Sequence, residues 1–169
     1  MKKFFQKILA RKKQIGIFLL IVFVVIQFIR PERNSGMAAN ANDITNYTKV
    51  SPEVKNILQT SCFDCHSDHT EYPWYTNIQP VGWWLNHHVE EGKGEINFSQ
   101  FKQYGIRRQI RKFEEVSEMI TEGEMPLNSY LWIHGDAKLD AGQKKALLDW
   151  ANLNYDSLVK LYPDSVKRR

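Results

Sequence analysis

The chain has 169 residues but only two cysteines, Cys62 and Cys65. Two thiols this close in sequence cannot supply the disulfide framework of a small secreted scaffold. The sequence also lacks segments with the alternating apolar and polar pattern of a β-strand, and it shows no internal repeat. These absences argue against sheet and repeat architectures, and they favour an all-α fold.

Acidic residues are absent from the first 30 positions, which carry seven Lys or Arg. Residues 31–169 therefore hold 16 basic and 19 acidic side chains, a net charge of −3, although the whole chain carries +4. The basic isoelectric point of the chain thus arises largely from the positive charges of its first 30 residues. The remainder of the chain gives no reason to expect a nucleic-acid partner.

An apolar run from Ile15 to Ile29 follows six of these positive charges. As a helix it would be about 22 Å long, against a hydrocarbon core of about 30 Å. A cleaved signal peptide and an uncleaved anchor both remain open. Gln27, Arg30 and Pro31 end the run without small residues, which favours the anchor. Residues 1–30 are therefore predicted to form a basic cytoplasmic tip and a single transmembrane signal anchor of the bacterial inner membrane, with the C-terminal part in the periplasm.

The two cysteines belong to the run Cys62-Phe63-Asp64-Cys65-His66, which reads Cys-x-x-Cys-His. This pattern is the attachment signature of a c-type haem, in which two thiols form thioethers and the following histidine is the proximal iron ligand. The motif therefore predicts one covalently bound haem c. Cys62 and Cys65 would be the points of attachment, and His66 would be the proximal ligand.

Two other uses of the cysteines were weighed. A structural zinc site needs four protein ligands, but no finger-like spacing connects the motif to His69, His87, His88 or His134. A thioredoxin-like dithiol follows a strand of a βαβ unit, and no strand pattern precedes Cys62. Both alternatives are weaker than haem attachment.

Helical periodicity and capping residues divide the rest of the chain. Residues 31–48 are predicted to be a linker, residues 49–155 a haem-binding domain, and residues 156–169 a polar tail. Ser51 and Pro52 predict the start of a helix that delivers the motif. Further helices are predicted over Val81 to about Glu91, where Gly92 and Gly94 end the helix, over about Tyr104–Glu122, and from an Asp140/Gln143 capping box to about Asn154. The charges Arg107, Arg108, Arg111 and Lys112 are interpreted as a solvated face.

The distal iron ligand is less strongly indicated than the proximal one. Met125 follows the end of a predicted helix and precedes Pro126, so a loop there could place its thioether over a haem. Core filling by Met125 and ligation by His87, His88 or His134 remain alternatives. Trp74, Tyr75 and Trp84 are candidates to cover a haem edge, although each could equally fill the protein core.

Several runs beyond the motif carry a family resemblance. They are Cys62–Ser67, Tyr72–Tyr75, Asn77–Val81, Trp83–Trp84, His88–Gly92, Glu122–Pro126, Ser129–Tyr130 and His134–Ala137. Over about residues 20–155 the sequence resembles the small bacterial haem-binding domain family of the cytochrome c type. This resemblance implies a small cytochrome c-like helical domain around one haem, preceded by a single membrane segment. By similarity to cytochromes c with a Met-Pro strap, it implies Met125 as the distal ligand.

These features favour a membrane-anchored, periplasm-facing mono-haem cytochrome that transfers electrons to a redox partner protein and is not an enzyme. The alternative is a haem-based sensor or peroxidase-like protein, in which the distal ligand is displaceable. Nothing in the sequence indicates an oligomeric state.

Overall fold

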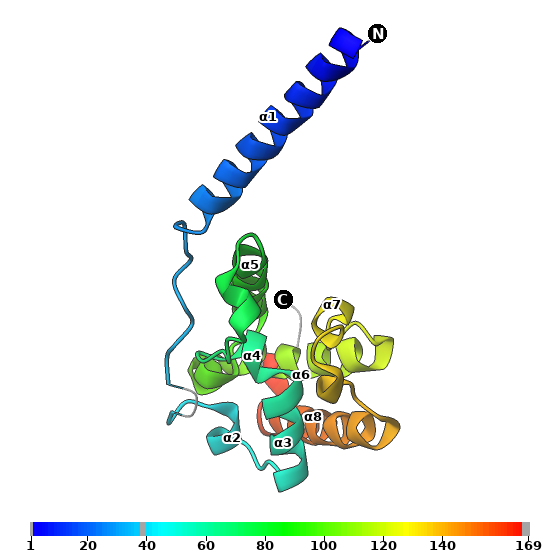
Figure 1. Cartoon of the computed structure of the whole chain (residues 1–169). Helices are drawn as coiled ribbons and strands as arrows, with labels where there is room; N and C mark the ends of the chain where they lie inside the picture. Colours follow the sequence, from blue (N-terminus) through cyan, green and yellow to red (C-terminus); the bar gives the residue numbers. More distant parts are fainter. Residues whose placement is uncertain (1, 38–39, 167–169) are drawn as a thin grey trace. The chain divides into compact units, whose positions relative to one another are not determined.

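The computed structural model describes residues 2–37 and 40–166 of the chain (Figure 1). Its elements are α1 (Lys2–Ile26), α2 (Ile44–Tyr47), α3 (Pro52–Ser61), α4 (Phe63–His66), η1 (Trp74–Asn77), α5 (Val81–Glu95), η2 (Phe98–Gln103), α6 (Ile106–Glu122), α7 (Asn128–Leu131), η3 (Gly135–Ala137), α8 (Ala141–Leu161) and η4 (Pro163–Ser165). Within the described ranges, β-structure is limited to an isolated bridge between Ser35 and His69. The predicted all-α fold is therefore confirmed.

The chain divides into two compact units, which are described separately. The larger unit comprises Asn34–Glu71 and Val89–Arg169, and the smaller comprises Met1–Arg33 and Tyr72–His88. The division falls within α5, so residues 81–88 of that helix belong to the smaller unit and residues 89–95 to the larger one.

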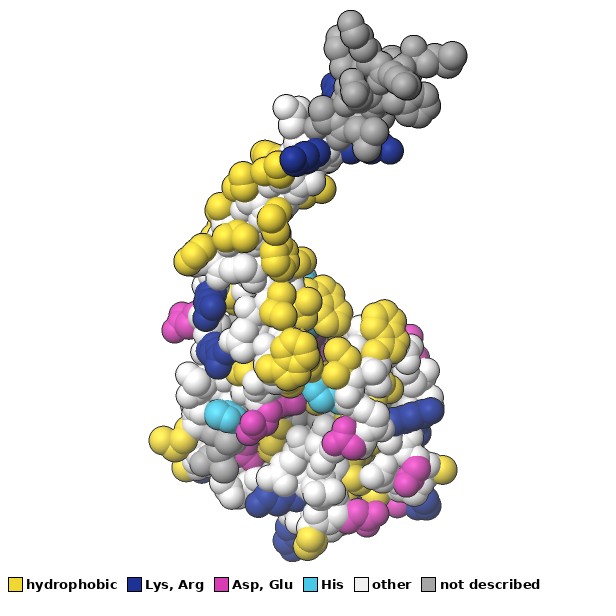
Figure 2. Space-filling view, in the orientation of Figure 1, with side chains coloured by type: hydrophobic (Ala, Val, Ile, Leu, Met, Phe, Trp, Pro, Cys, Tyr) yellow, Lys and Arg dark blue, Asp and Glu magenta, His cyan; other side chains and the backbone are white. Residues whose placement is uncertain are grey.

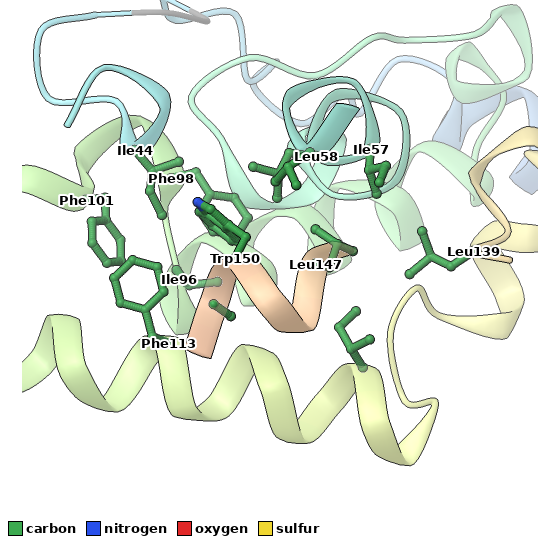
Figure 3. Close-up of a cluster of buried hydrophobic side chains, with 13 residues drawn as sticks. Ile44, Ile57, Leu58, Ile96, Phe98, Phe101, Phe113, Leu139, Leu147 and Trp150 are labelled. Carbon is green, nitrogen blue, oxygen red and sulfur yellow. The ribbon is translucent and has the colours of Figure 1, made fainter. Parts of the chain in front are cut away.

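The core of the larger unit is built around the packing of α6 against α8. Buried side chains from α3, η2, α6 and α8 meet there in one cluster, and Figure 3 shows Phe113 and Trp150 side by side within it. Their rings lie edge to face with centroids 5.5 Å apart. Removing these side chains from water is the main favourable term for folding of the unit.

Local signals fix the ends of two helices in the predicted places. The Ser51 hydroxyl accepts a hydrogen bond from the Val54 amide at the start of α3 (3.2 Å). Asp140 and Gln143 form the predicted capping box at the start of α8. Because these caps satisfy backbone groups that a helix leaves without partners, they locate the helix starts from local sequence alone.

Two parts of the larger unit are more ordered than the sequence indicated. The segment assigned to a linker contains α2, and Ile44 at the start of that helix is fully buried in the core. The last helix continues to Leu161, beyond the predicted end near Asn154. A single buried apolar residue in an otherwise polar segment is too weak a signal to reveal α2.

In the smaller unit, α1 ends at Ile26, and the next residue is held by side-chain hydrogen bonds. The Gln27 amide donates to the Gln79 carbonyl oxygen (3.2 Å), and its oxygen accepts from the Gln79 amide (2.8 Å). The Trp83 indole N–H donates to the Ile29 carbonyl oxygen (2.7 Å). The predicted apolar helix is therefore cut short at a point where polar contacts begin.

The predicted transmembrane helix is wrong. Figure 2 shows apolar side chains along α1, but no helix among the described residues is both long and apolar enough to cross a membrane. The helical part of the apolar run, residues 15–26, spans only about 18 Å at 1.5 Å per residue. Lys12 and Lys13 lie within the three residues before it. The predicted single-pass inner-membrane localisation rested on this helix and is contradicted by the same finding.

Candidate haem site

The haem-attachment segment, defined as Cys62–His66, follows directly from α3. Cys62 is the residue at which α3 ends and α4 begins. Its amide donates to the Leu58 carbonyl oxygen (3.0 Å), and its carbonyl oxygen accepts from the amides of Cys65 (3.2 Å) and His66 (3.0 Å). The two thiols and the imidazole are thus held within one helical turn, as the motif predicted.

The imidazole of His66 is fixed by two carbonyl groups of another segment. Its Nδ1 lies 2.8 Å from the Gly92 carbonyl oxygen and 3.1 Å from that of Ile96. Because a carbonyl oxygen can only accept, Nδ1 carries the proton and Nε2 is the basic nitrogen. Burial lowers the pKa of His66 below its ordinary value, although the same two hydrogen bonds oppose that shift. The ring is therefore a neutral, oriented imidazole, which is the form that binds iron.

Gly92 lets α5 approach the attachment segment closely. A Cβ atom at this position would lie 2.7 Å from the Cys65 carbonyl oxygen and 3.2 Å from the Cys65 Cβ. The prediction that Gly92 and Gly94 end the helix is wrong, because α5 continues through both glycines to Glu95. Gly92 is required for close packing inside a helix, and that packing brings its carbonyl oxygen within reach of His66.

The thiols of the segment are not activated. Burial raises the pKa of Cys62 to about 12 and that of Cys65 to about 11, with smaller effects from the neighbouring thiol and from Asp64 respectively. Reactive and metal-binding cysteines have lowered thiol pKa values instead. The zinc alternative also needs further ligands, and no group of three or more His, Cys, Asp or Glu in the described part of the chain could hold a metal ion.

A polar network continues from the motif. The Asp68 carboxylate accepts hydrogen bonds from Asn97 (2.7 Å) and Gln100, and it forms an ion pair with Lys93 (3.2 Å). Burial raises the pKa of Asp68, but these hydrogen bonds and the Lys93 charge outweigh it, so the net shift is downward. The network therefore ties the residues after His66 to α5 and η2.

A family model covers this part of the chain together with most of the rest. The family model described as "Haem-binding domain" matches residues 21–153. The chain belongs to the haem-binding domain family. No curated protein and no solved structure matches the chain.

The haem-attachment segment fits the group that this family binds. Two thiols within one turn can reach one macrocycle, and the basic Nε2 of His66 is the nitrogen left for iron after Nδ1 has bonded to two carbonyls. The family membership establishes haem binding by the chain.

Met125 lies in a loop that follows α6, and residues 124–134 are called the Met125 loop. The helix ends at Gly123, which has a φ of +76°, and the amides of Glu124 (3.0 Å) and Met125 (3.4 Å) return to the Met119 carbonyl oxygen. Met125 is half-buried and packs against the core cluster, as does Cys62. The structure thus places the candidate distal ligand and one attachment cysteine at the edge of the same core.

The candidate aromatic residues belong to the smaller unit. Trp74 and Tyr75 lie in η1 with their rings edge to face, and Trp74 is 75% exposed. Trp84 lies in α5, is 44% exposed, and packs on His88 with ring centroids 4.4 Å apart. The exposure of Trp74 and Trp84 excludes the interpretation that they fill a protein core. Their role at a haem remains a prediction.

The three histidines considered as distal ligands differ in their surroundings. His87 and His88 belong to the smaller unit, where their ring centroids lie 6.0 Å apart. The buried Nδ1 of His88 has no hydrogen-bond partner among the residues that the structure describes. His134 belongs to the larger unit and stacks on the Tyr130 ring at 4.1 Å. None of these contacts selects one histidine as a ligand.

Sequence reasoning missed two charged or polar contacts near the attachment segment. The Tyr130 hydroxyl donates to the Asp64 carboxylate (2.8 Å), and burial together with this bond strongly raises the pKa of Tyr130. Lys112, interpreted as part of a solvated face, is only 4% exposed and forms ion pairs with Glu115 and Glu95. Neither the tertiary contact of Tyr130 nor the burial of one lysine within a charged run leaves a signal in the local sequence.

Proposed function

We propose that the chain is a mono-haem c-type cytochrome that carries electrons for a redox partner protein. In this proposal Cys62 and Cys65 hold the haem covalently, His66 is the proximal iron ligand, and Met125 is the distal one. Bound haem supplies one-electron chemistry, because its iron changes between the ferric and ferrous states. The observation that carries the proposal is the oriented His66 imidazole directly after two thiols one helical turn apart.

Formation of the two thioether bonds to the haem would need no further reactant. Cys62 and Cys65 would each add across one vinyl group, so that an S–H bond would break, an S–C bond would form, and the hydrogen would go to the other vinyl carbon. No oxidant or reductant is consumed. Each sulfur stays uncharged as a thioether, which suits positions where burial already disfavours the thiolate of Cys62 and Cys65.

Distal ligation by Met125 is supported by its place beside the core that Cys62 also borders. A neutral thioether favours ferrous iron more than a second imidazole does, so a His/Met pair gives a higher potential than a His/His pair. If His66 and Met125 both bound the iron, it would be closed to external molecules. This arrangement suits electron transfer better than catalysis on a bound substrate.

Covalent attachment is tested on protein produced together with a cytochrome c maturation system. After denaturation and acid–acetone extraction, a pyridine haemochrome assay should find the haem with the chain. The matched variant Cys62→Ala/Cys65→Ala should release its haem into the organic phase. If the unchanged chain also releases its haem, the protein binds haem without thioether bonds, and the c-type proposal is wrong.

The distal ligand is tested by absorption spectra of the oxidised and reduced holoprotein, with and without carbon monoxide. We expect a low-spin spectrum that carbon monoxide leaves unchanged. Met125→Ala should keep the covalent haem but bind carbon monoxide readily. Rapid binding by the unchanged protein would instead favour the haem-based sensor or peroxidase-like alternative. A low-spin spectrum retained by Met125→Ala would show that another residue is the ligand.

A further inference from the structure

The Met125 loop is a small folded piece with bonds within its own turn. The amides of Tyr130 (3.0 Å) and Leu131 (3.1 Å) donate to the Leu127 carbonyl oxygen, and the His134 amide donates to that of Tyr130 (3.1 Å). The Tyr130 and His134 rings stack at 4.1 Å with an interplanar angle of 14°. Residues 127–134 therefore form one hydrogen-bonded unit within the loop, and Met125 lies two residues before that unit.

The Tyr130 side chain connects this piece to the haem-attachment segment. Its hydroxyl donates to Oδ2 of Asp64 at 2.8 Å, and Asp64 lies between the two cysteines of the motif. Asp64 is itself held from the other side. The Glu71 amide donates to its Oδ1 (3.0 Å), and the Thr70 hydroxyl donates to its carbonyl oxygen (2.6 Å). The acceptor for Tyr130 is therefore a fixed point.

A second hydrogen bond lies just beyond the loop. The Ser61 hydroxyl, at the end of α3, donates to the Ala137 carbonyl oxygen (2.9 Å). The stretch from Tyr130 to Ala137 is thus hydrogen-bonded at two points to residues 61–64, through Tyr130 to Asp64 and through Ala137 to Ser61. Upstream of Tyr130, the amides of Glu124 and Met125 bond to Met119 of α6, and Met125 packs on the core. The Tyr130 hydroxyl adds a hydrogen bond from the loop to the motif itself.

From these contacts we infer that Tyr130 is a positioning residue that holds the Met125 loop against the haem-attachment segment through Asp64. The inference rests on the proposed function, because it matters only where Met125 binds the iron. A hydrogen bond from a hydroxyl to a carboxylate is stronger and more directional than one between neutral groups. Its loss would let the loop shift and lengthen the time during which the iron lacks its distal ligand.

The test is Tyr130→Phe in the covalently loaded holoprotein. This change removes one oxygen atom and keeps the ring that stacks on His134. We expect carbon monoxide to bind the reduced protein about tenfold faster than it binds the unchanged protein, which corresponds to one hydrogen bond to a charged group. The methionine-to-iron absorption band of the oxidised protein should weaken in parallel, while the amount of covalent haem stays the same.

Two comparisons separate positioning from a general structural effect. Tyr162→Phe removes the same atom from a tyrosine at the end of α8 and should leave carbon monoxide binding unchanged. Asp64→Asn removes the carboxylate charge and should accelerate binding as Tyr130→Phe does. The double variant should be no faster than the quicker single variant, because one change removes and the other weakens the same bond.

The outcomes distinguish this inference from the proposed function. If Met125→Ala opens the iron while Tyr130→Phe behaves like Tyr162→Phe, the inference is overturned and the proposed ligand stands. If Met125→Ala leaves the spectrum unchanged, both the distal ligand and the role of Tyr130 are wrong. Additive effects of Tyr130→Phe and Asp64→Asn would also contradict the inference, since they would show independent actions.

Discussion

The haem-attachment segment and the Met125 loop are both short, but they are held in different ways. The attachment segment is contacted from several directions: His66 bonds to the carbonyls of Gly92 and Ile96, and Asp64 bonds to Thr70, Glu71 and Tyr130. The backbone of the Met125 loop bonds within its own turn or returns to the end of α6.

This difference bears on how the two proposed ligands would behave. The His66 ring is oriented by protein contacts that need no haem, so the proximal ligand is preorganised. Met125 is placed by a loop in which Trp132 and Ile133 are mostly exposed. Few buried contacts make a segment prone to local opening. We therefore expect ligand exchange to occur on the Met125 side, while the His66 side stays in place.

The largest expected effect comes from removing the ring that supports the attachment segment. Phe98 is 3% exposed, and its ring lies 5.6 Å from that of Phe63 and 6.0 Å from that of His66. Truncating a buried phenylalanine to alanine leaves a cavity and costs about 3–5 kcal/mol. Phe98→Ala should therefore lower the free energy of unfolding by that amount, measured by urea denaturation.

A second core position makes this result specific. Phe113→Ala should cost a similar amount, but Phe113 packs on Phe101 and Trp150 rather than on His66. Only Phe98→Ala should also reduce the yield of covalent haem per folded chain. Equal haem yields in the two variants would show that Phe98 supports the fold without orienting the proximal ligand.

The next-largest expected effect on stability distinguishes Gly92 from Gly94, two glycines of α5. Gly92→Ala would place a Cβ 2.7 Å from the Cys65 carbonyl oxygen, whereas a Cβ at Gly94 meets no atom within 4 Å. Overpacking of this kind costs about 1–3 kcal/mol. In contrast, replacing an unhindered helical glycine by alanine stabilises a protein by about 0.5–1 kcal/mol. The denaturation midpoints of the two variants should therefore shift in opposite directions, and shifts of the same sign would contradict the close approach.

Gly92 also illustrates what the sequence can and cannot predict. The Cys-x-x-Cys-His motif and the caps at Ser51 and Asp140 are local patterns, and the structure places them as expected. Gly92 was predicted to end a helix together with Gly94, because glycine is common just past the end of a helix. A glycine is required at position 92 because the helix backbone there lies close to Cys65, a residue 27 positions earlier in the chain. A close approach between residues so far apart in sequence leaves no local signal.

The same limit explains the other differences. The Tyr130 contact with Asp64 and the burial of Lys112 depend on tertiary packing, which periodicity does not specify. The membrane anchor was predicted from the composition of residues 15–29, but the helix ends at Ile26, and its helical apolar part is too short. The composition of a segment does not indicate where polar tertiary contacts begin, and here they begin at Gln27.

The smallest expected effect lies on the Met125 side. Gly123 ends α6 with a φ of +76°, where an L-residue is strained, and a Cβ there meets no atom within 4 Å. Gly123→Ala should therefore lower the free energy of unfolding by only about 1 kcal/mol, through backbone strain alone.

Because the strain falls two residues before Met125, carbon monoxide binding to the reduced holoprotein should accelerate more than it does in Phe113→Ala, despite the smaller loss of stability. Gly123→Asn should restore slow binding, since asparagine tolerates this conformation better. If carbon monoxide binding instead follows overall stability across these variants, the Met125 side is no more easily opened than the rest of the domain, and the contrast between the two sides of the haem does not hold.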